Sequence, residues 1–201
     1  TPVVLVDLGD NIGGGSAADS TVHFHELRRQ GADRVLGVIW DPDAVQHCVR
    51  SGVGAEVSLD VGGHADHNAP PLNVQGRVRL IHDGRYVEQL PRHGGIRVND
   101  QGLTAAVESE GANTLVLTTL RHPPFSLGQL TSLGLRPEDA RVIVVKAAVA
   151  YMAAYEPIAG TIIPADTPGL PAPNPARYTY QKIRRPILPL DPARSVEAAY
   201  R

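Results

Sequence analysis

The sequence has few cysteine and aromatic residues and no marked excess of either charge. Its single cysteine, Cys48, excludes an internal disulfide framework and a cysteine-rich metal site. Aromatic residues make up only 4% of the chain, so we expect a core of Val, Leu, Ile and Ala. The formal net charge of −2 gives no electrostatic basis for nucleic-acid binding. No apolar run approaches the roughly 20 residues of a membrane-spanning helix, so we expect no membrane partner either.

The length of 201 residues suits one domain, or one domain with a small appendage. The first residues lack the basic region of a secretory signal peptide, and there is no initiator Met. Instead, Thr1-Pro2 leads at once into an apolar run that is typical of a strand. We therefore expect a cytoplasmic domain excised from a longer protein.

Strand-like and helix-like segments alternate in the first part of the chain. Asp41-Pro42 is a strong helix start, because Asp is a good N-cap and Pro suits the first helical position. Later, two strand-like runs at 74–81 and 86–90 flank Asp83-Gly84, which predicts a β-hairpin. Other predicted strands are 3–8, 34–40, 55–61, 105–109, 114–119 and 141–145, and predicted helices are 21–30, 42–51 and 126–133. The pattern predicts an α/β fold, with a mixed sheet flanked by helices and a β-hairpin insertion.

The composition of the sequence changes from Pro157 onward, where proline becomes frequent. Nine of the 17 prolines lie between Pro157 and Pro192. We predict a core domain over residues 1–156 and a Pro-rich C-terminal extension over 157–201, packed on the core. Composition leaves a linker as the alternative for this extension.

A glycine-rich turn follows the first predicted strand. Gly13, Gly14 and Gly15 leave the backbone bare, so its N–H groups can approach a ligand, and Asp10 and Asn11 can orient that ligand. In an α/β protein this turn lies at the carboxyl edge of the sheet, where such proteins build their sites. The alternative is a tight strand-to-helix crossover that needs glycine for its backbone angles. The spacing matches neither a dinucleotide fingerprint nor a Walker loop.

Lys146 follows a predicted buried strand and can reach the same edge, where it would bind a carboxylate or another anion. The alternative is a surface lysine whose stem lies along apolar neighbours. Arg121-His122-Pro123 follows another strand, so these groups either face the same crevice or form an ordinary loop.

Histidines offer only weak metal signals. His23 and His25 lie two residues apart, which places them on different faces of a helix. His64, Asp66 and His67 have suitable ligand atoms for zinc, but they fall in a polar loop that is typical of solvated surface. We therefore assign no metal ligand in this chain.

Several ordered segments together resemble one known family. They begin with Val6-Asp7-Leu8-Gly9-Asp10-Asn11-Ile12-Gly13-Gly14-Gly15-Ser16 and continue through Trp40-Asp41-Pro42, Ser51-Gly52-Val53-Gly54-Ala55, Val144-Val145-Lys146, Asp166-Thr167-Pro168-Gly169 and Arg185-Pro186-Ile187-Leu188-Pro189. This succession resembles the C-terminal domain of the MlrC-like proteins, relatives of the microcystin-degradation protein C that are classed as zinc metallopeptidases. The resemblance covers about 190 of the 201 residues. One departure is Ala150, which stands where family members tend to carry a His.

The resemblance implies a domain of a metallohydrolase that cleaves a peptide or amide bond. It implies that an N-terminal domain, absent from this chain, holds most or all of the zinc ligands. On this reading Asp10, Asn11, Gly13, Gly14, Gly15 and Lys146 would orient the substrate, while the catalytic residues stay unassigned and the isolated chain is expected to be inactive. Two alternatives remain open: a non-catalytic domain for dimerisation or interdomain docking, with a homodimer as one form, and an independent binder of an anion or small molecule.

Overall fold

A computed structural model of the chain describes residues 1–65, 68–90 and 93–193. Its centre is an eight-stranded mixed sheet in the order β10-β1-β9-β2-β8-β7-β4-β3. From β10 to β8 the neighbouring strands are parallel, and from β8 to β3 they are antiparallel. The sheet strands are β1 (Val3–Asp7), β2 (Val35–Trp40), β3 (Glu56–Val61), β4 (Leu72–His82), β7 (Thr104–Ser109), β8 (Asn113–Thr118), β9 (Val142–Val145) and β10 (Thr161–Ala165). The predicted mixed α/β sheet is confirmed.

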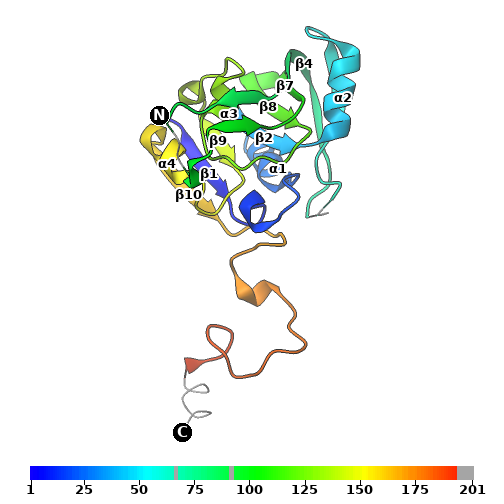
Figure 1. Cartoon of the computed structure of the whole chain (residues 1–201). Coiled ribbons are helices and arrows are strands. Elements are labelled where there is room, and N and C mark those ends of the chain that lie inside the picture. Colours follow the sequence, from blue (N-terminus) through cyan, green and yellow to red (C-terminus); the bar gives the residue numbers. More distant parts are fainter. Residues whose placement is uncertain (66–67, 91–92, 194–201) are drawn as a thin grey trace.

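Helices cover the sheet on both sides (Figure 1). The α-helices are α1 (Val22–Arg29), α2 (Pro42–Ser51), α3 (Gly128–Thr131) and α4 (Met152–Tyr155). Single 3₁₀ turns lie at Ile12–Gly14, His93–Gly95, Glu110–Ala112, Pro137–Asp139, Glu156–Ile158 and Pro175–Arg177. As predicted, Asp41 caps α2, since its Oδ1 accepts a hydrogen bond from the Ala44 N–H at 2.9 Å. No described helix has the length and apolarity needed to cross a membrane.

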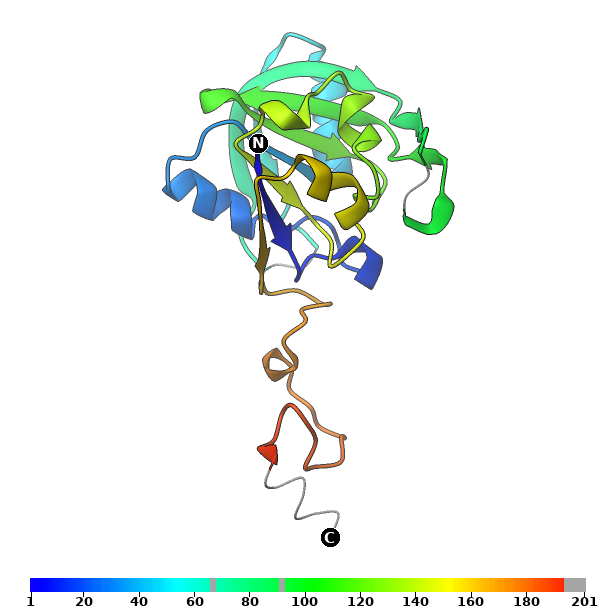
Figure 2. The ribbon, with the colours of Figure 1, turned by 90° about the vertical axis from the view of Figure 1, so that its left-hand side faces the viewer.

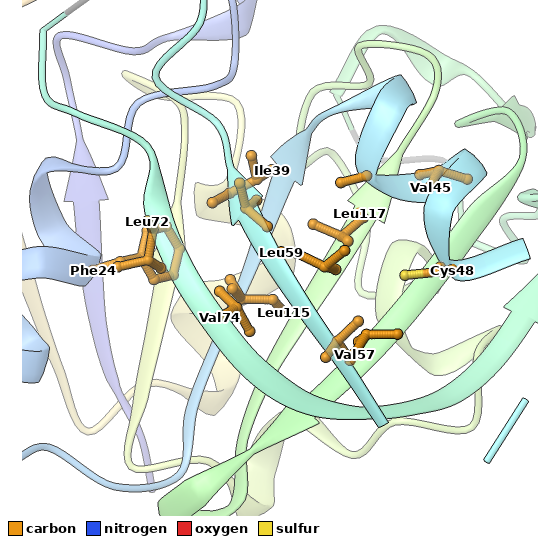
Figure 3. Close-up of a cluster of buried hydrophobic side chains, with 14 of the residues drawn as sticks. Phe24, Ile39, Val45, Cys48, Val57, Leu59, Leu72, Val74, Leu115 and Leu117 are labelled. Atoms are coloured by element: carbon orange, nitrogen blue, oxygen red, sulfur yellow. The ribbon is translucent and has the colours of Figure 1, made fainter. Parts of the chain in front are cut away.

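Alternation along the strands divides the core between the two sides of the sheet. On one side Phe24 of α1 and Val45 and Cys48 of α2 pack against strand residues such as Leu115 (Figure 3). On the other side, strand residues such as Val6, Val116 and Ile143 pack against Leu130 and the segment around α4, where Ala150 lies buried. The position that departs from the family pattern therefore fills an apolar core in this chain.

The predicted insertion is present, but one of its strands pairs differently from the prediction. The predicted partner of 86–90 was 74–81, yet β4 pairs with β3 and β7. Instead β5 (Arg85–Val87) pairs antiparallel with β6 (Val98–Asp100) in a separate two-stranded sheet. Glycine at position 84 permits this path: its φ is +77°, and a Cβ there would lie 1.8 Å from the carbonyl oxygen of Gly102. The chain therefore leaves the main sheet at Gly84 instead of folding back along β4.

The Pro-rich extension begins with a strand that the sequence did not reveal. Thr161–Ala165 forms β10, the edge strand parallel to β1, and Pro164 is tolerated because an edge strand needs fewer backbone donors. Beyond it, both views show the chain leaving the sheet and extending away from the body (Figures 1 and 2). The domain boundary at residue 156 and the packing of the extension on the core stay predictions, although the sheet itself runs past that boundary.

One close contact on the α1 side offers a test of the packing. A Cβ on Gly37 would lie 2.5 Å from Cζ of Phe24, so Gly37→Ala overpacks this part of the core. We expect a loss of about 1–3 kcal/mol in the free energy of unfolding, measured by urea titration. Ser58→Ala, on the exposed face of β3, is the control and should stay within about 0.5 kcal/mol of wild type. Equal stability of the two variants would contradict the tight packing of Phe24 on β2.

Candidate functional site

Lys146 is buried at the carboxyl edge of the sheet, immediately after β9. Its Nζ donates hydrogen bonds to Asp10 Oδ2 at 2.7 Å and to the Ser20 carbonyl oxygen at 2.6 Å. Asp7 Oδ2 lies 3.7 Å from the same ammonium. The side chain of Lys146 is only 3% exposed and that of Asp10 is fully buried. The parallel pairing of β1 with β9 aligns Val6 with Val145, which brings the residues that follow them, Asp7 and Lys146, to the same level.

Asp10 fixes the loop that links β1 to α1. Its Oδ1 accepts a hydrogen bond from the Ala18 N–H, and its Oδ2 accepts one from the Ser20 N–H, both at 2.8 Å. Ala18 has a φ of +65°, which is unfavourable for alanine and so needs such support. Asp10 therefore joins the two ends of this loop and holds them against Lys146.

Asp7 and Thr167 connect the same loop to the segment after β10. The Thr167 hydroxyl donates to Asp7 Oδ1 and accepts a hydrogen bond from the Gly9 N–H at 2.9 Å. Asp7 Oδ1 also accepts from the Asp10 N–H at 3.1 Å. Gly9 lies so close to this segment that a Cβ there would meet the Thr167 carbonyl oxygen at 2.3 Å. The segment after β10, where the C-terminal extension leaves the sheet, is thus hydrogen-bonded to the site through Thr167.

Asp19 and Asp41 anchor a second loop at the same edge. Asp19 Oδ2 accepts hydrogen bonds from the N–H groups of His64 and Ala65, at 2.8 and 2.7 Å. Asp41 Oδ2 accepts one from the Gly62 N–H at 2.9 Å. His64 itself is exposed, with Nε2 3.7 Å from Asp41 Oδ2, while Asp66 and His67 lie outside the described residues.

The electrostatics of the cluster keep Lys146 and Asp10 charged. Burial by itself would lower the pKa of Lys146, but the carboxylates of Asp10 and Asp7 outweigh it and hold that pKa above its usual range. Burial would likewise raise the pKa of Asp10, but the Lys146 ammonium and the backbone hydrogen bond from Ser20 hold it below its usual range. Burial lowers the pKa of His23 against the opposing effect of Asp7, so its imidazole is neutral at pH 7.

Several buried polar atoms around this pair have no hydrogen-bond partner. They are Asp7 Oδ2, Asp19 Oδ1, Ser20 Oγ and His23 Nε2, with His23 Nε2 lying 3.9 Å from Asp7 Oδ2. The two histidines of α1 do face different surroundings, as predicted, because His25 Nε2 lies 2.9 Å from the Pro70 carbonyl oxygen. Among the residues that the structure describes, no group of three or more His, Cys, Asp or Glu side chains is placed to hold a metal.

The glycine turn uses its backbone donors internally. The N–H groups of Gly13, Gly14 and Gly15 bond to Asn11 Oδ1, the Asn11 carbonyl and the Ile12 carbonyl, at 3.1, 2.9 and 3.0 Å. Gly15 needs its glycine because φ is +91°, and Gly14 because a Cβ would lie 2.7 Å from Cβ of Pro171. Gly13 has no such steric need, and all three glycines are exposed. The three N–H groups that were predicted to bind an anion are therefore already bonded within the turn. A ligand role for this turn stays a prediction.

Arg121 and His122, predicted as one loop after β8, point to different parts of the molecule. The Arg121 guanidinium stacks 3.6 Å from the centroid of the Trp40 ring, and its Nε donates to the Ala17 carbonyl oxygen at 2.8 Å. His122 turns instead to the insertion, with Nε2 3.0 Å from the Tyr86 hydroxyl. Only Arg121 supports the loop between β1 and α1.

Comparison with known proteins places this chain in a family. The sequence model described as "MlrC C-terminus" matches residues 5–182. The chain belongs to the MlrC C-terminal domain family. Microcystinase C from Sphingomonas sp. is 26% identical over 193 residues, which cover 95% of this chain and 36% of that protein. A solved structure of a candidate metallopeptidase from Mesorhizobium sp. BNC1 is similar with a TM-score of 0.79 and 27% identity, over 94% of this chain and 38% of the other.

The buried ion pair gives a stability test. Lys146→Met leaves the Asp10 and Asp7 carboxylates buried without their ammonium partner, so we expect a loss of about 3–5 kcal/mol in the free energy of unfolding. Arg77→Met is the control, because the Arg77–Glu56 pair is about two-thirds exposed and should contribute less than about 1 kcal/mol. Urea unfolding measures both, and a loss at Lys146 no larger than that at Arg77 would contradict the cluster.

His23 predicts a pH dependence of stability. Its pKa is lowered in the folded state, so below the usual value of 6.5 the unfolded chain binds this proton more readily. Stability is therefore lost as the pH falls from 6.5 toward the folded pKa. Asp10 and Lys146 do not titrate there, since their shifts move them below 3.8 and above 10.5. Burial also lowers the pKa of His122, so His23→Gln should reduce but not abolish the slope of unfolding free energy between pH 7 and 5, whereas substitution of the exposed His47 by Gln should reduce it less.

Proposed function

We propose that this chain is the C-terminal domain of an MlrC-like metallohydrolase, which hydrolyses a peptide or amide bond. The observation that supports this most directly is the match of the family over residues 5–182. The chain spans little more than a third of the length of the relatives it matches, so the rest of such a protein would supply an N-terminal domain. A cytoplasmic location remains a prediction.

The donor atoms of the described residues do not fit a catalytic zinc site. Such a site takes three protein ligands, and no group of three suitable side chains comes together in the described part. We therefore propose that zinc is bound by the N-terminal domain, and we derive no step through it from this chain. The role of this chain would be to contact and orient the substrate.

The buried cluster divides the predicted site residues into two kinds. Asp10 and Lys146 are enclosed, so they would act as positioning residues that hold the loop between β1 and α1. Asn11 and the glycines at 13–15 lie at the surface of the same loop and could contact a substrate. Asn11 is the stronger candidate, because the Gly13 N–H holds its Oδ1 in place while its Nδ2 amide group is of the kind that donates to a substrate carbonyl.

This role can be tested in the full-length protein. We expect Asn11→Ala to lower kcat/KM for a peptide substrate about tenfold, which corresponds to losing one hydrogen bond of about 1.4 kcal/mol in the transition state. Gln75→Ala, exposed on β4, is the control and should leave kcat/KM unchanged. Wild-type activity of Asn11→Ala in a folded protein would show that the turn is not part of the site. If the isolated chain were as active as the full-length protein, an N-terminal domain would not be needed for hydrolysis.

A second candidate role is docking to another chain or domain. It is favoured by the large apolar side chains that the C-terminal extension exposes. These residues follow the last strand of the sheet, β10, and a homodimer is one form of this role.

A further inference from the structure

The C-terminal extension forms an arm of residues 170–191 that carries its apolar side chains on the outside. Large apolar residues that are 36–70% exposed on this arm are Leu170, Tyr178, Tyr180, Ile183, Ile187 and Leu188. Local bonds keep the arm in shape: the Tyr178 hydroxyl donates to the Leu170 carbonyl at 2.6 Å, and Arg185 pairs with Asp191 at 2.8 Å. Such a concentration of exposed apolar groups is typical of a surface that another chain covers.

The β5–β6 insertion carries a second exposed apolar surface. We call it the insertion surface and define it by Val87, Leu90, Ile96 and Val98, which are 46–75% exposed. Val87 and Val98 face each other across the two strands. The opposite side of this small sheet is turned into the protein, with Tyr86 and Asn99 buried. A two-stranded sheet is marginally stable alone, so cover on its outer side would stabilise it.

The two surfaces are not joined within one chain. The arm leaves the body after β10 and extends away from the green β5–β6 segment (Figure 2). The insertion, residues 83–100, has three acidic and three basic residues and so no net charge, but residues 1–165 as a whole have a formal net charge of −5 and the arm one of +3, so the arm is attracted to the body of another copy. Extended, the 22 residues of the arm reach up to about 70 Å, whereas a domain of this size is about 40 Å across. The arm is therefore long enough to cross a neighbouring domain.

We propose that two copies of this chain form a dimer in which the arm of each copy covers the insertion surface of the other. This proposal gives the docking role above a definite partner and does not depend on hydrolysis. In a two-fold symmetric dimer, the arm and the insertion surface of both copies are covered at the same time. Two-fold symmetry is also the commonest symmetry of homodimers. Opposite net charges favour the encounter of arm and body, and the apolar side chains supply the contact itself.

Sedimentation velocity of the chain over a range of concentrations tests the dimer. We expect a reversible monomer–dimer equilibrium in the wild type. Ile183→Ser with Leu188→Ser on the arm, and separately Val87→Thr with Val98→Thr on the insertion surface, should each raise the dimer Kd at least tenfold. Val53→Ser is the control, since Val53 is 63% exposed but lies on neither surface, and it should leave the Kd unchanged. Circular dichroism checks that each variant keeps its fold.

A mixture of the arm variant and the insertion variant separates this arrangement from other dimers. The heterodimer keeps one intact contact, so the mixture should dimerise more strongly than either variant alone. A mixture no better than its components overturns the proposal. Three other results would also overturn it. The wild type could be monomeric at every concentration, neither pair of substitutions could weaken the dimer, or only one of the two pairs could weaken it.

Discussion

The buried ammonium of Lys146 is the constraint on which the carboxyl edge of this domain depends. An ammonium at the end of β9 with no access to water must have acceptors, and Asp10 and the Ser20 carbonyl provide them. Asp10 can do so only if the loop between β1 and α1 closes on itself, which it does through the Ala18 and Ser20 N–H groups. The position of one charged group therefore determines the path of a whole loop.

This cluster contributes more to specificity of conformation than to net stability. A buried ion pair often does no better than an apolar replacement of the same shape, since both charges lose their hydration. What the pair provides here is a single allowed arrangement for a loop that contains Gly13, Gly14 and Gly15 and would otherwise have many. A site at the surface of such a loop gains from being held in place before a ligand arrives. The remaining cost is that two buried carboxylate oxygens, Asp7 Oδ2 and Asp19 Oδ1, accept no hydrogen bond.

Local sequence signals predicted where most strands and helices lie along the chain but not the contacts that build the edge. Asp41-Pro42 identified α2, and the apolar runs identified the strands, because these signals act over a few residues. The change of partner at Gly84 depends on Gly102, and β10 is obscured by Pro164, so neither could be seen locally. The contact of Thr167 with the site was not predicted for the same reason: its partner Asp7 is 160 residues away in the chain.

Thr167 also links the two exposed features of the domain. Its hydroxyl is bonded to Asp7 and Gly9 in the loop after β1, while the arm begins only a few residues beyond it. Gly14 of the turn lies directly against Pro171 at the start of the arm. A partner that covers the arm would therefore also restrain the backbone of the loop between β1 and α1, which positions Asn11 and the glycine turn. Through this contact, the proposed docking of the arm would be coupled to the candidate site, because a partner that orders the arm would also limit the movement of the loop after β1.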